Sequence, residues 1–186
     1  MLSELLEKLA HGLDARRVPY MVIGGQAVLV YGEPRMTRDI DITLGVGPEE
    51  LAKVEDLVST LGLKTLPESP AEFVRQRMVL PCKDEKSGFR IDFIFSFTPY
   101  ERQAIERARA VQIGNTKVRF ASPGDLIIHK MAAGRPRDEE DVRGILLKTG
   151  PIDVPYIEHW LRQFDQALGR GTLESFQNLR QSVHKQ

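Results

Sequence analysis

The sequence predicts a chain of mixed α-helices and β-strands that folds as one unit with two lobes. Apolar residues recur at helical spacing in several segments, the first of which is marked by Leu2, Leu5, Leu6, Leu9 and Leu13. Strand-like segments flank turn residues twice, and this pattern predicts two β-hairpins. The remainder of the chain, after residue 121, reads as helices. We therefore expect a core over residues 1–121 and a helical C-terminal lobe over residues 122–186.

Composition limits the classes of function. The 186 residues are enough for a substantial core, and Lys plus Arg balance Asp plus Glu at 26 each. No overall field draws such a chain to nucleic acid or to a membrane, so any RNA binding must be local. The single Cys82 cannot form an intramolecular disulfide and is interpreted as a structural or incidental thiol. Without a signal pattern or a long apolar span, a cytoplasmic protein with no membrane partner is expected.

The N-terminal half begins with a helix and a short buried strand over residues 20–23. Gly24 and Gly25 come next, and residues 26–31 read as a helix. Two glycines let the backbone approach a ligand closely and direct its amides at an anion near the helix N-terminus. A plain tight turn would explain the same pair, so the glycines indicate a ligand only in combination with acidic residues further along the chain.

Further elements alternate along the core. Helices are expected over residues 48–62, 71–76 and 100–109, and strands over residues 35–44, 78–80, 89–97, 111–113 and 117–120. In the C-terminal lobe, Ser122 and Pro123 have the order of a helix start, and this helix carries Lys130. A second helix should begin near Pro136, and two more come after Pro151.

Three acidic residues stand out. In a strand, Arg35, Thr37, Asp39, Asp41 and Thr43 would share one face, with apolar side chains on the other. Asp92 lies opposite a phenylalanine-rich stripe in residues 89–97. Alone, Asp92 reads as a solvent-facing acid paired with Arg90. Together with Asp39 and Asp41 on a neighbouring strand, it completes a set of three carboxylates suited to Mg²⁺ or Mn²⁺.

These motifs resemble the DNA polymerase β-like nucleotidyltransferase superfamily. Its signature is a Gly-Gly or Gly-Ser turn, an Asp-x-Asp pair and a third acid on a later strand, matched by Gly24-Gly25, Asp39-x-Asp41 and Asp92. Residues 31–41 and 122–141 also resemble the bacterial group that includes AbiEii-type toxins. The resemblance implies an α+β nucleotidyltransferase fold, in which a small mixed β-sheet has helices packed on one face and is followed by a helical C-terminal lobe.

The implied chemistry is transfer of a nucleoside monophosphate from an NTP, ATP among them, to an acceptor, with release of pyrophosphate. The resemblance implies Asp39, Asp41 and Asp92 as catalytic and metal-binding residues. It implies nucleotide binding by the following residues: Gly24, Gly25, Arg35, Thr37 and Lys130. Such a reaction depends on positioning and charge neutralisation more than on covalent help from the protein.

The acceptor is left open as tRNA, another protein or a small molecule, and no DNA partner is expected. The toxin-like resemblance adds an antitoxin as an expected partner. An antibiotic adenylyltransferase of the aminoglycoside or lincosamide kind is an alternative, because those enzymes have a similar core. A catalytically weak module that binds a nucleotide or a partner is another. For the charged run of Arg135, Arg137, Asp138 and Asp141, helix capping and a functional role remain alternatives.

Overall fold

The computed structural model describes residues 1–34, 36–96 and 98–184, and it divides the chain into two compact units. The first unit is Met1–Gln26 with Thr37–Ala121, and the second is Ala27–Met36 with Ser122–Gln186. Residues 27–36, which the sequence placed in the core lobe, thus group with the C-terminal helices.

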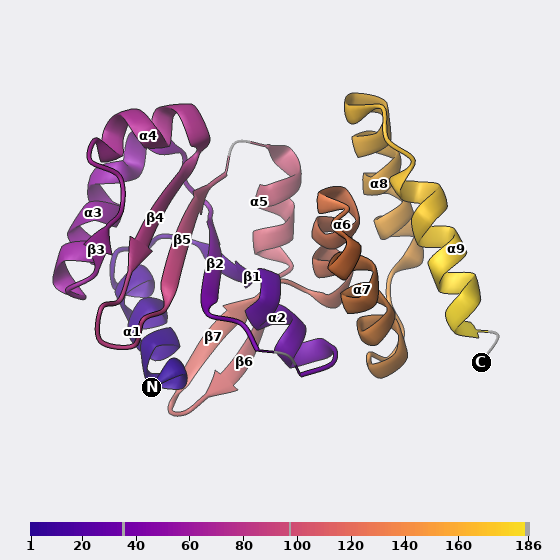
Figure 1. Cartoon of the computed structure of the whole chain (residues 1–186), viewed down its shortest axis with the longest axis horizontal. Helices are drawn as coiled ribbons and strands as arrows, with labels where there is room; N and C mark the ends of the chain where they lie inside the picture. Colours follow the sequence, from indigo (N-terminus) through magenta and orange to yellow (C-terminus); the bar gives the residue numbers. More distant parts are fainter. Residues whose placement is uncertain (35, 97, 185–186) are drawn as a thin grey trace. The chain divides into compact units, whose positions relative to one another are not determined.

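The first unit is built on a mixed β-sheet (Figure 1), and within the described residues it has seven strands in the order β3-β4-β5-β2-β1-β7-β6. The strands are β1 (Tyr20–Ile23), β2 (Asp39–Leu44), β3 (Lys64–Thr65), β4 (Val79–Lys83), β5 (Arg90–Phe95), β6 (Arg109–Ile113) and β7 (Thr116–Phe120). Strands β2 and β5 pair in parallel, as do β1 and β7, whereas the other neighbours are antiparallel. The predicted α+β class and mixed sheet are confirmed.

Both predicted hairpins are present, as β4–β5 and as β6–β7. The predicted strand over residues 35–44 is shorter, because β2 begins at Asp39. Thr37 therefore precedes the strand, and Arg35 lies outside the described residues. The two-residue edge strand β3 was not predicted, since so short a segment has no periodicity to detect.

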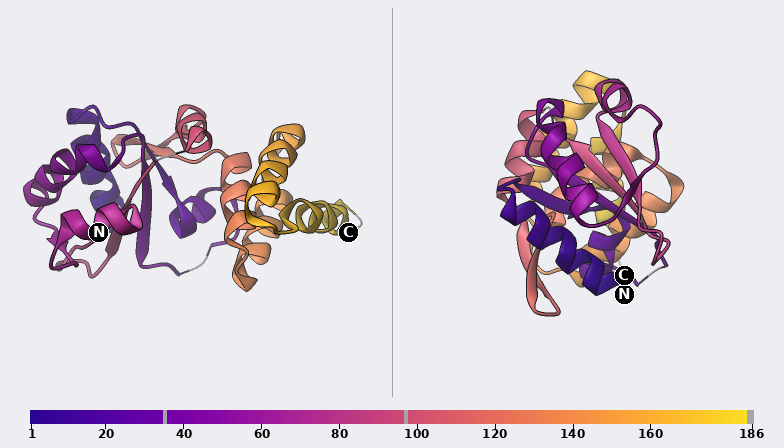
Figure 2. Two further views of the ribbon diagram at one scale, coloured as in Figure 1. Left: turned by 90° about the horizontal axis from the view of Figure 1, so that it is seen from above. Right: turned by 90° about the vertical axis from the view of Figure 1, so that its left-hand side faces the viewer.

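The helices of this unit are α1 (Leu2–Ala15), the 3₁₀ helix η1 (Pro48–Glu50), α3 (Leu51–Thr60), α4 (Pro70–Arg77) and α5 (Pro99–Glu106). The views of Figure 2 show α1 beside the β6–β7 hairpin, where Thr116 bonds with Glu7 and His11 of α1. Arg119 points to the opposite sheet face, and its guanidinium donates to the Ile105 carbonyl in α5 at 2.9 Å. Helix α5 thus adds cover on the face opposite α1.

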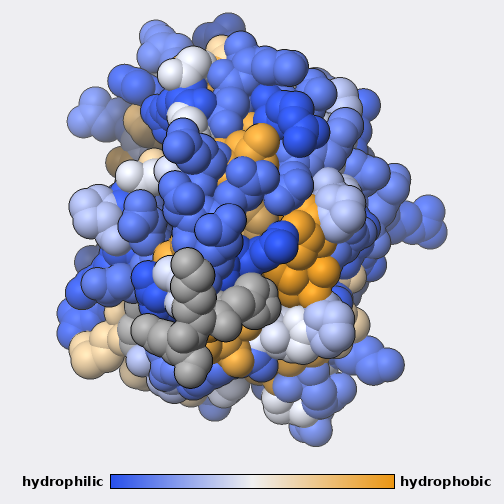
Figure 3. Space-filling view, turned by 90° about the vertical axis from the view of Figure 1, so that its right-hand side faces the viewer, coloured by the Kyte–Doolittle hydropathy of each residue, from blue (hydrophilic) through white to orange (hydrophobic). Residues whose placement is uncertain are grey.

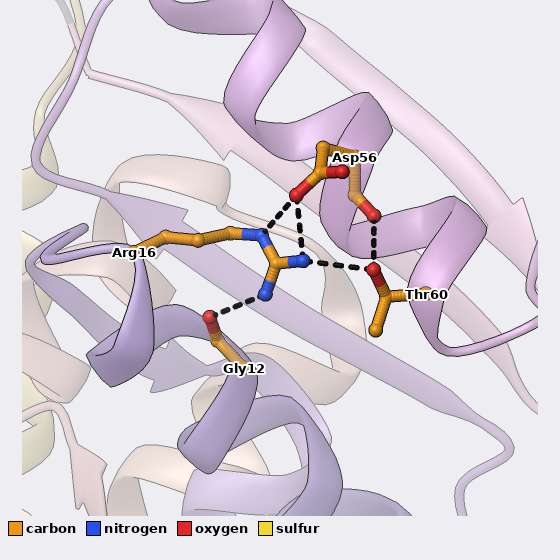
Figure 4. Close-up of polar contacts among 4 residues, drawn as sticks. All are labelled: Gly12, Arg16, Asp56 and Thr60. Carbon is orange, nitrogen blue, oxygen red and sulfur yellow. Dashed lines mark hydrogen bonds and ion pairs between the residues drawn. The ribbon is translucent and has the colours of Figure 1, made fainter.

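Arg16, at the end of α1, ties that helix to α3 (Figure 4). Its guanidinium donates to Asp56 at 2.9 Å and to Thr60 at 2.9 Å, and a third bond reaches the Gly12 carbonyl at 3.1 Å. Because Asp56 is largely exposed, the ion pair itself adds little stability. The hydrogen bonds to Asp56 and Thr60 connect the end of α1 to α3.

Helix α2 (Gly24–Tyr31) begins in the first unit and ends in the second. The second unit also contains α6 (Pro123–Ala133), α7 (Pro136–Lys148), α8 (Val154–Leu168) and α9 (Thr172–His184). Ser122 caps α6 as predicted, since its hydroxyl accepts from the Asp125 amide at 3.2 Å. Tyr156 of α8 donates to the fully buried Asp125 carboxylate at 2.8 Å, and this bond joins α8 to the start of α6.

The view from the C-terminal side shows a mostly hydrophilic surface with a local apolar area (Figure 3). Met36, Leu147 and Leu168 are the large apolar side chains of this unit that are exposed among the described residues. None of the described helices combines the length and the apolar character that crossing a membrane requires.

Candidate active site

The three predicted acids lie on one face of two adjacent strands. In the parallel β2–β5 pair, Asp41 is in register with Asp92, and Asp39 is in register with Arg90. Residues in register on neighbouring strands project from the same face of a sheet. Asp39 is exposed, whereas Asp41 and Asp92 are half-buried. The structure therefore brings together the acids that the sequence singled out.

Burial of the opposite face explains this placement. Ile40 and Ile42 alternate with the acids of β2 and are at most 1% exposed, and Ile91 and Phe93 do the same in β5. Because side chains alternate between faces with a period of two, burying these apolar residues turns Asp39, Asp41 and Asp92 outward. The predicted alternation of residues 89–97 is confirmed over the strand that is described.

Arg90 supplies the nearest cation. Its Nε donates to Asp92 Oδ1 at 2.8 Å, as the simpler interpretation of Asp92 predicted. This hydrogen bond raises the pKa of Arg90 most strongly, burial lowers it, and the charges of Asp92, Asp39 and Asp41 raise it further. The guanidinium thus lies within the electrostatic field of all three carboxylates and partly offsets their repulsion.

The Gly24–Gly25 turn lies directly against the acids. Gly24 has a φ of +65°, and a Cβ on it would stand 2.1 Å from Asp41 Oδ2. A Cβ on Gly25 would stand 2.8 Å from Thr37 Oγ1. Only glycine fits both the backbone conformation and the close approach at position 24. The turn at the start of α2 and the Asp41 carboxylate therefore form one continuous site.

Gln26 holds the start of the acidic strand, a role that the sequence analysis did not assign. Its side chain is 3% exposed, and Nε2 donates to the Asp39 carbonyl at 3.2 Å. The Thr37 hydroxyl accepts from the Asp39 amide at 3.4 Å. In the sequence, this role could have been inferred from the position of Gln26, a polar residue near the start of an otherwise apolar helix. Thr37, predicted to bind nucleotide, touches the glycine turn and the backbone of Asp39.

The donor set suits a hard divalent cation in its chemistry and placement, because carboxylate oxygens are the ligands that Mg²⁺ and Mn²⁺ prefer. Within the part of the chain that the structure describes, however, no three His, Cys, Asp or Glu side chains converge as a ready metal site. One carboxylate oxygen of Asp92 is instead engaged by Arg90. Metal ligation by Asp39, Asp41 and Asp92 stays a prediction.

Lys130, predicted to bind phosphate, lies in the second unit in a buried ion cluster. Its Nζ is 2.7 Å from Asp138 Oδ1 and 2.7 Å from Asp141 Oδ2, and all three side chains are at most 10% exposed. Asp138 also accepts from the Arg135 amide at 3.0 Å, at the start of α7. These contacts give Asp138 and Asp141 a structural role and occupy the ammonium group, so a phosphate role for Lys130 stays a prediction.

A polar cavity of about 540 Å³ borders this cluster within the second unit. Its lining includes the following charged residues: Lys130, Asp138, Glu139, Arg170 and Glu174. Three carboxylates and two cations line the cavity, and Lys130 and Asp138 are paired with each other. Such a lining favours a cationic or polar ligand over an anion.

Cys82 has no place in the chemistry. It is fully buried in β4, and burial, with a smaller contribution from the charge of Asp92, raises the pKa of its thiol to about 12. A thiol that stays protonated is a poor nucleophile. The interpretation of Cys82 as a structural residue agrees with this environment.

The mixed sheet and the glycine turn beside paired acids define a nucleotidyltransferase domain. The chain belongs to the family described as "Nucleotidyl transferase of unknown function (DUF2204)", whose model matches residues 2–185. The predicted enzyme class and superfamily are thereby confirmed, whereas the AbiEii-type resemblance stays a prediction. No curated protein sequence matches the chain.

Solved structures share the fold at low sequence identity. An antigenic nucleotidyltransferase-like protein from Paracoccidioides brasiliensis has a TM-score of 0.60 at 15% identity, over 96% of this chain and 93% of that chain. The antibiotic-resistance factor ANT(2'')-Ia has a TM-score of 0.55 at 18% identity, over 99% and 91%. A structure of the same factor with adenylyl-2''-tobramycin gives 0.54 at 19% identity, over 99% and 97%. At these identities the likeness concerns the fold alone.

Replacement of Gly24 by alanine should destabilise the folded protein. The variant carries the strain of a left-handed residue, about 1–2 kcal/mol, and in addition its Cβ meets the Asp41 carboxylate. Gly62→Ala is the matched control, because Gly62 has the same φ of +65° and nothing within 4 Å of the added Cβ. Urea unfolding should show a larger loss for Gly24→Ala. Equal losses would mean that the close approach to Asp41 is not a constraint.

Replacement of Lys130 by methionine should lower the free energy of unfolding by about 3–5 kcal/mol, since it strands two buried carboxylates. Lys148→Met is the control in the same unit, because Lys148 pairs with Glu33 at 2.9 Å while both side chains remain well exposed. Lys148→Met should change the free energy of unfolding by no more than about 1 kcal/mol. If urea unfolding shows the two variants to be equally stable, Lys130 is not a structural cation and its ammonium is free for a ligand.

Proposed function

We propose that this chain transfers a nucleoside monophosphate from an NTP to an acceptor hydroxyl. The observation that carries the proposal is the position of Asp41, which lies between the Gly24 turn and the registered Asp92 on one sheet face. A phosphate-binding turn beside a pair of acids places nucleotide and charge neutralisation at one point. The family membership supports the same reaction class.

In the proposed reaction, the acceptor oxygen forms a bond to the α-phosphorus as the bond from that phosphorus to the β-phosphate oxygen breaks. Pyrophosphate leaves with the electron pair. Asp92 accepts the hydroxyl proton, and Arg90 orients the Asp92 carboxylate for this purpose. The amides of Gly24 and Gly25 bind phosphate oxygens, with Thr37 and Arg35 as further nucleotide contacts.

Mg²⁺ or Mn²⁺ is the proposed cofactor, held by Asp39, Asp41 and Asp92. Nucleotidyltransferases generally use divalent metals, and the metal supplies neutralisation of the triphosphate charge. ATP is the first NTP to test. Three acids on one face also argue against a module that only binds nucleotide, because their mutual repulsion serves no such role.

For the acceptor, tRNA, another protein and a small molecule remain candidates. The acid-rich cavity in the second unit favours a cationic small molecule, and the fold likeness to ANT(2'')-Ia points the same way. Incubation with labelled ATP and tobramycin tests that alternative directly.

A toxin role with an antitoxin partner is a further proposal. Growth arrest on expression of the active chain, relieved by a partner protein, would test it.

An NTP with millimolar Mg²⁺ should raise the melting temperature. A ligand that binds only the folded state adds about 2.7 kcal/mol of stability at a hundredfold excess over its Kd. Asp39→Asn should abolish most of the shift without unfolding the protein, because Asp39 is exposed. Asp14→Asn, at an exposed position of α1, should retain it. If none of the four NTPs raises the melting temperature, with Mg²⁺ or with Mn²⁺, the result would contradict the proposed transfer reaction.

Replacement of Asp92 by asparagine should affect transfer more than nucleotide binding. The variant keeps the size of the side chain and loses the base, so nucleotide incorporation should fall at least about a hundredfold. Nucleotide binding, measured on the same preparation by thermal shift, should persist with modest loss. Near-wild-type incorporation of nucleotide would contradict the role of Asp92 as the base, even if the variant is correctly folded.

A further inference from the structure

A row of cationic side chains crosses the sheet on the same face as the acids. Lys64 of β3 is in register with Lys83 of β4, Lys83 with Arg90 of β5, and Arg90 with Asp39 of β2. Residues in register share a sheet face, so Lys64, Lys83 and Arg90 form one line that ends at the acids. We call these three residues the cationic row.

The row is open to a ligand. Lys83 is exposed, and the side chains of Lys64 and Arg90 are 67% and 50% exposed. Lys64 lies 3.6 Å from Glu85, whose side chain is 68% exposed, and exposed pairs of this kind are weak. A phosphate could therefore replace the Glu85 carboxylate at little cost.

Protection of a sheet edge does not explain the whole row. Lysines commonly shield edge strands from pairing with other chains, and Lys64 lies on the edge strand β3. Lys83 and Arg90, however, belong to β4 and β5, which are paired on both sides. Pairing with Asp92 accounts for Arg90, so the position of Lys83 beside Arg90 needs another reason.

The position of the row separates it from the nucleotide turn. Gly24 contacts Asp41 from the β1 side of β2, whereas the row extends from β5 to β3 on the other side. Strands lie about 4.8 Å apart, so the three cations span roughly 10 Å. That length exceeds a single phosphate group and suits an extended chain of phosphates. A cationic small molecule would be repelled there.

We propose that the cationic row binds the sugar-phosphate backbone of a nucleic-acid strand, whose terminal hydroxyl is the acceptor. This assignment rests on the proposed transfer reaction. The strand lies over β3, β4 and β5, and its end reaches Asp92. RNA and DNA share the phosphate chemistry that the row recognises, and the experiment separates them.

The test measures binding of a labelled 20-nucleotide single strand to the full chain between 50 and 200 mM KCl, as RNA and as DNA of the same sequence. Each phosphate contact adds about 0.7 to the salt slope for single strands. The variant Lys64→Gln/Lys83→Gln should therefore lower the slope by about 1.4 and weaken binding about tenfold or more at 100 mM. Lys64→Gln alone should lower it by about half as much.

Lys8→Gln/Lys117→Gln is the matched control, because it removes the same charge from exposed positions of α1 and β7 outside the row. It should bind like the wild type, and both double variants should keep the thermal shift with NTP. The proposal that the cationic row binds the strand would be wrong if the two double variants weakened strand binding equally. It would also be wrong if Lys64→Gln/Lys83→Gln bound the strand like the wild type. A wild-type chain that binds neither strand but adenylylates tobramycin or a protein would contradict it as well.

The transfer reaction and the cationic row can fail separately. Absence of the NTP shift in the wild type would overturn the proposed transfer, and the acceptor role of the row with it. A normal NTP shift without strand binding would overturn the row alone. Stronger binding of RNA than of DNA at equal salt would assign the acceptor to RNA through its 2′-hydroxyls.

Discussion

The register of the parallel β2–β5 pair is the constraint on which the candidate site depends. Asp41 stands beside Asp92 only because Ile40, Ile42, Ile91 and Phe93 are all buried on the opposite face. A slip of one residue in either strand would carry its acids into the core and its apolar residues to the solvent. The packing energy of the whole sheet therefore opposes any displacement of the carboxylates, and the site needs no separate scaffold.

Local contacts then set the position of the acids more finely. The Gly24 backbone closes against the Asp41 carboxylate, and the buried Gln26 amide holds the carbonyl of Asp39. Both contacts come from the turn between β1 and α2. The segment that would bind phosphate thus also fixes the strand that would bind metal, so a change in one alters the other. This coupling explains why a single methyl group at position 24 should matter.

Two pairings of a cation with acids show how burial decides function. Lys130 is enclosed with Asp138 and Asp141, and opening that cluster would leave charges without water or a partner. Arg90 pairs with Asp92 at a half-exposed position, where solvent screens the charges and partners can exchange. The first arrangement stabilises a helical unit. The Arg90–Asp92 pair leaves a cation and an acid accessible to substrates. Lys64 and Lys83 are further accessible cations on the same face of the sheet.

The sequence by itself determined most of the helices and strands, the buried faces of β2 and β5 and the class of enzyme, but not the two-residue strand β3. The class of enzyme and the buried faces follow from local patterns, namely the alternation in residues 89–97, the Gly24-Gly25 pair and Asp39-x-Asp41. The alternation of apolar and polar residues indicates which side chains of a strand are buried. Only the tertiary structure decided the partners. Lys130 meets acids eight and eleven residues away, Gln26 meets Asp39, and the row from Lys64 to Arg90 exists only through strand pairing. Local periodicity encodes burial, whereas neighbours across strands and helices depend on the packing of the whole chain.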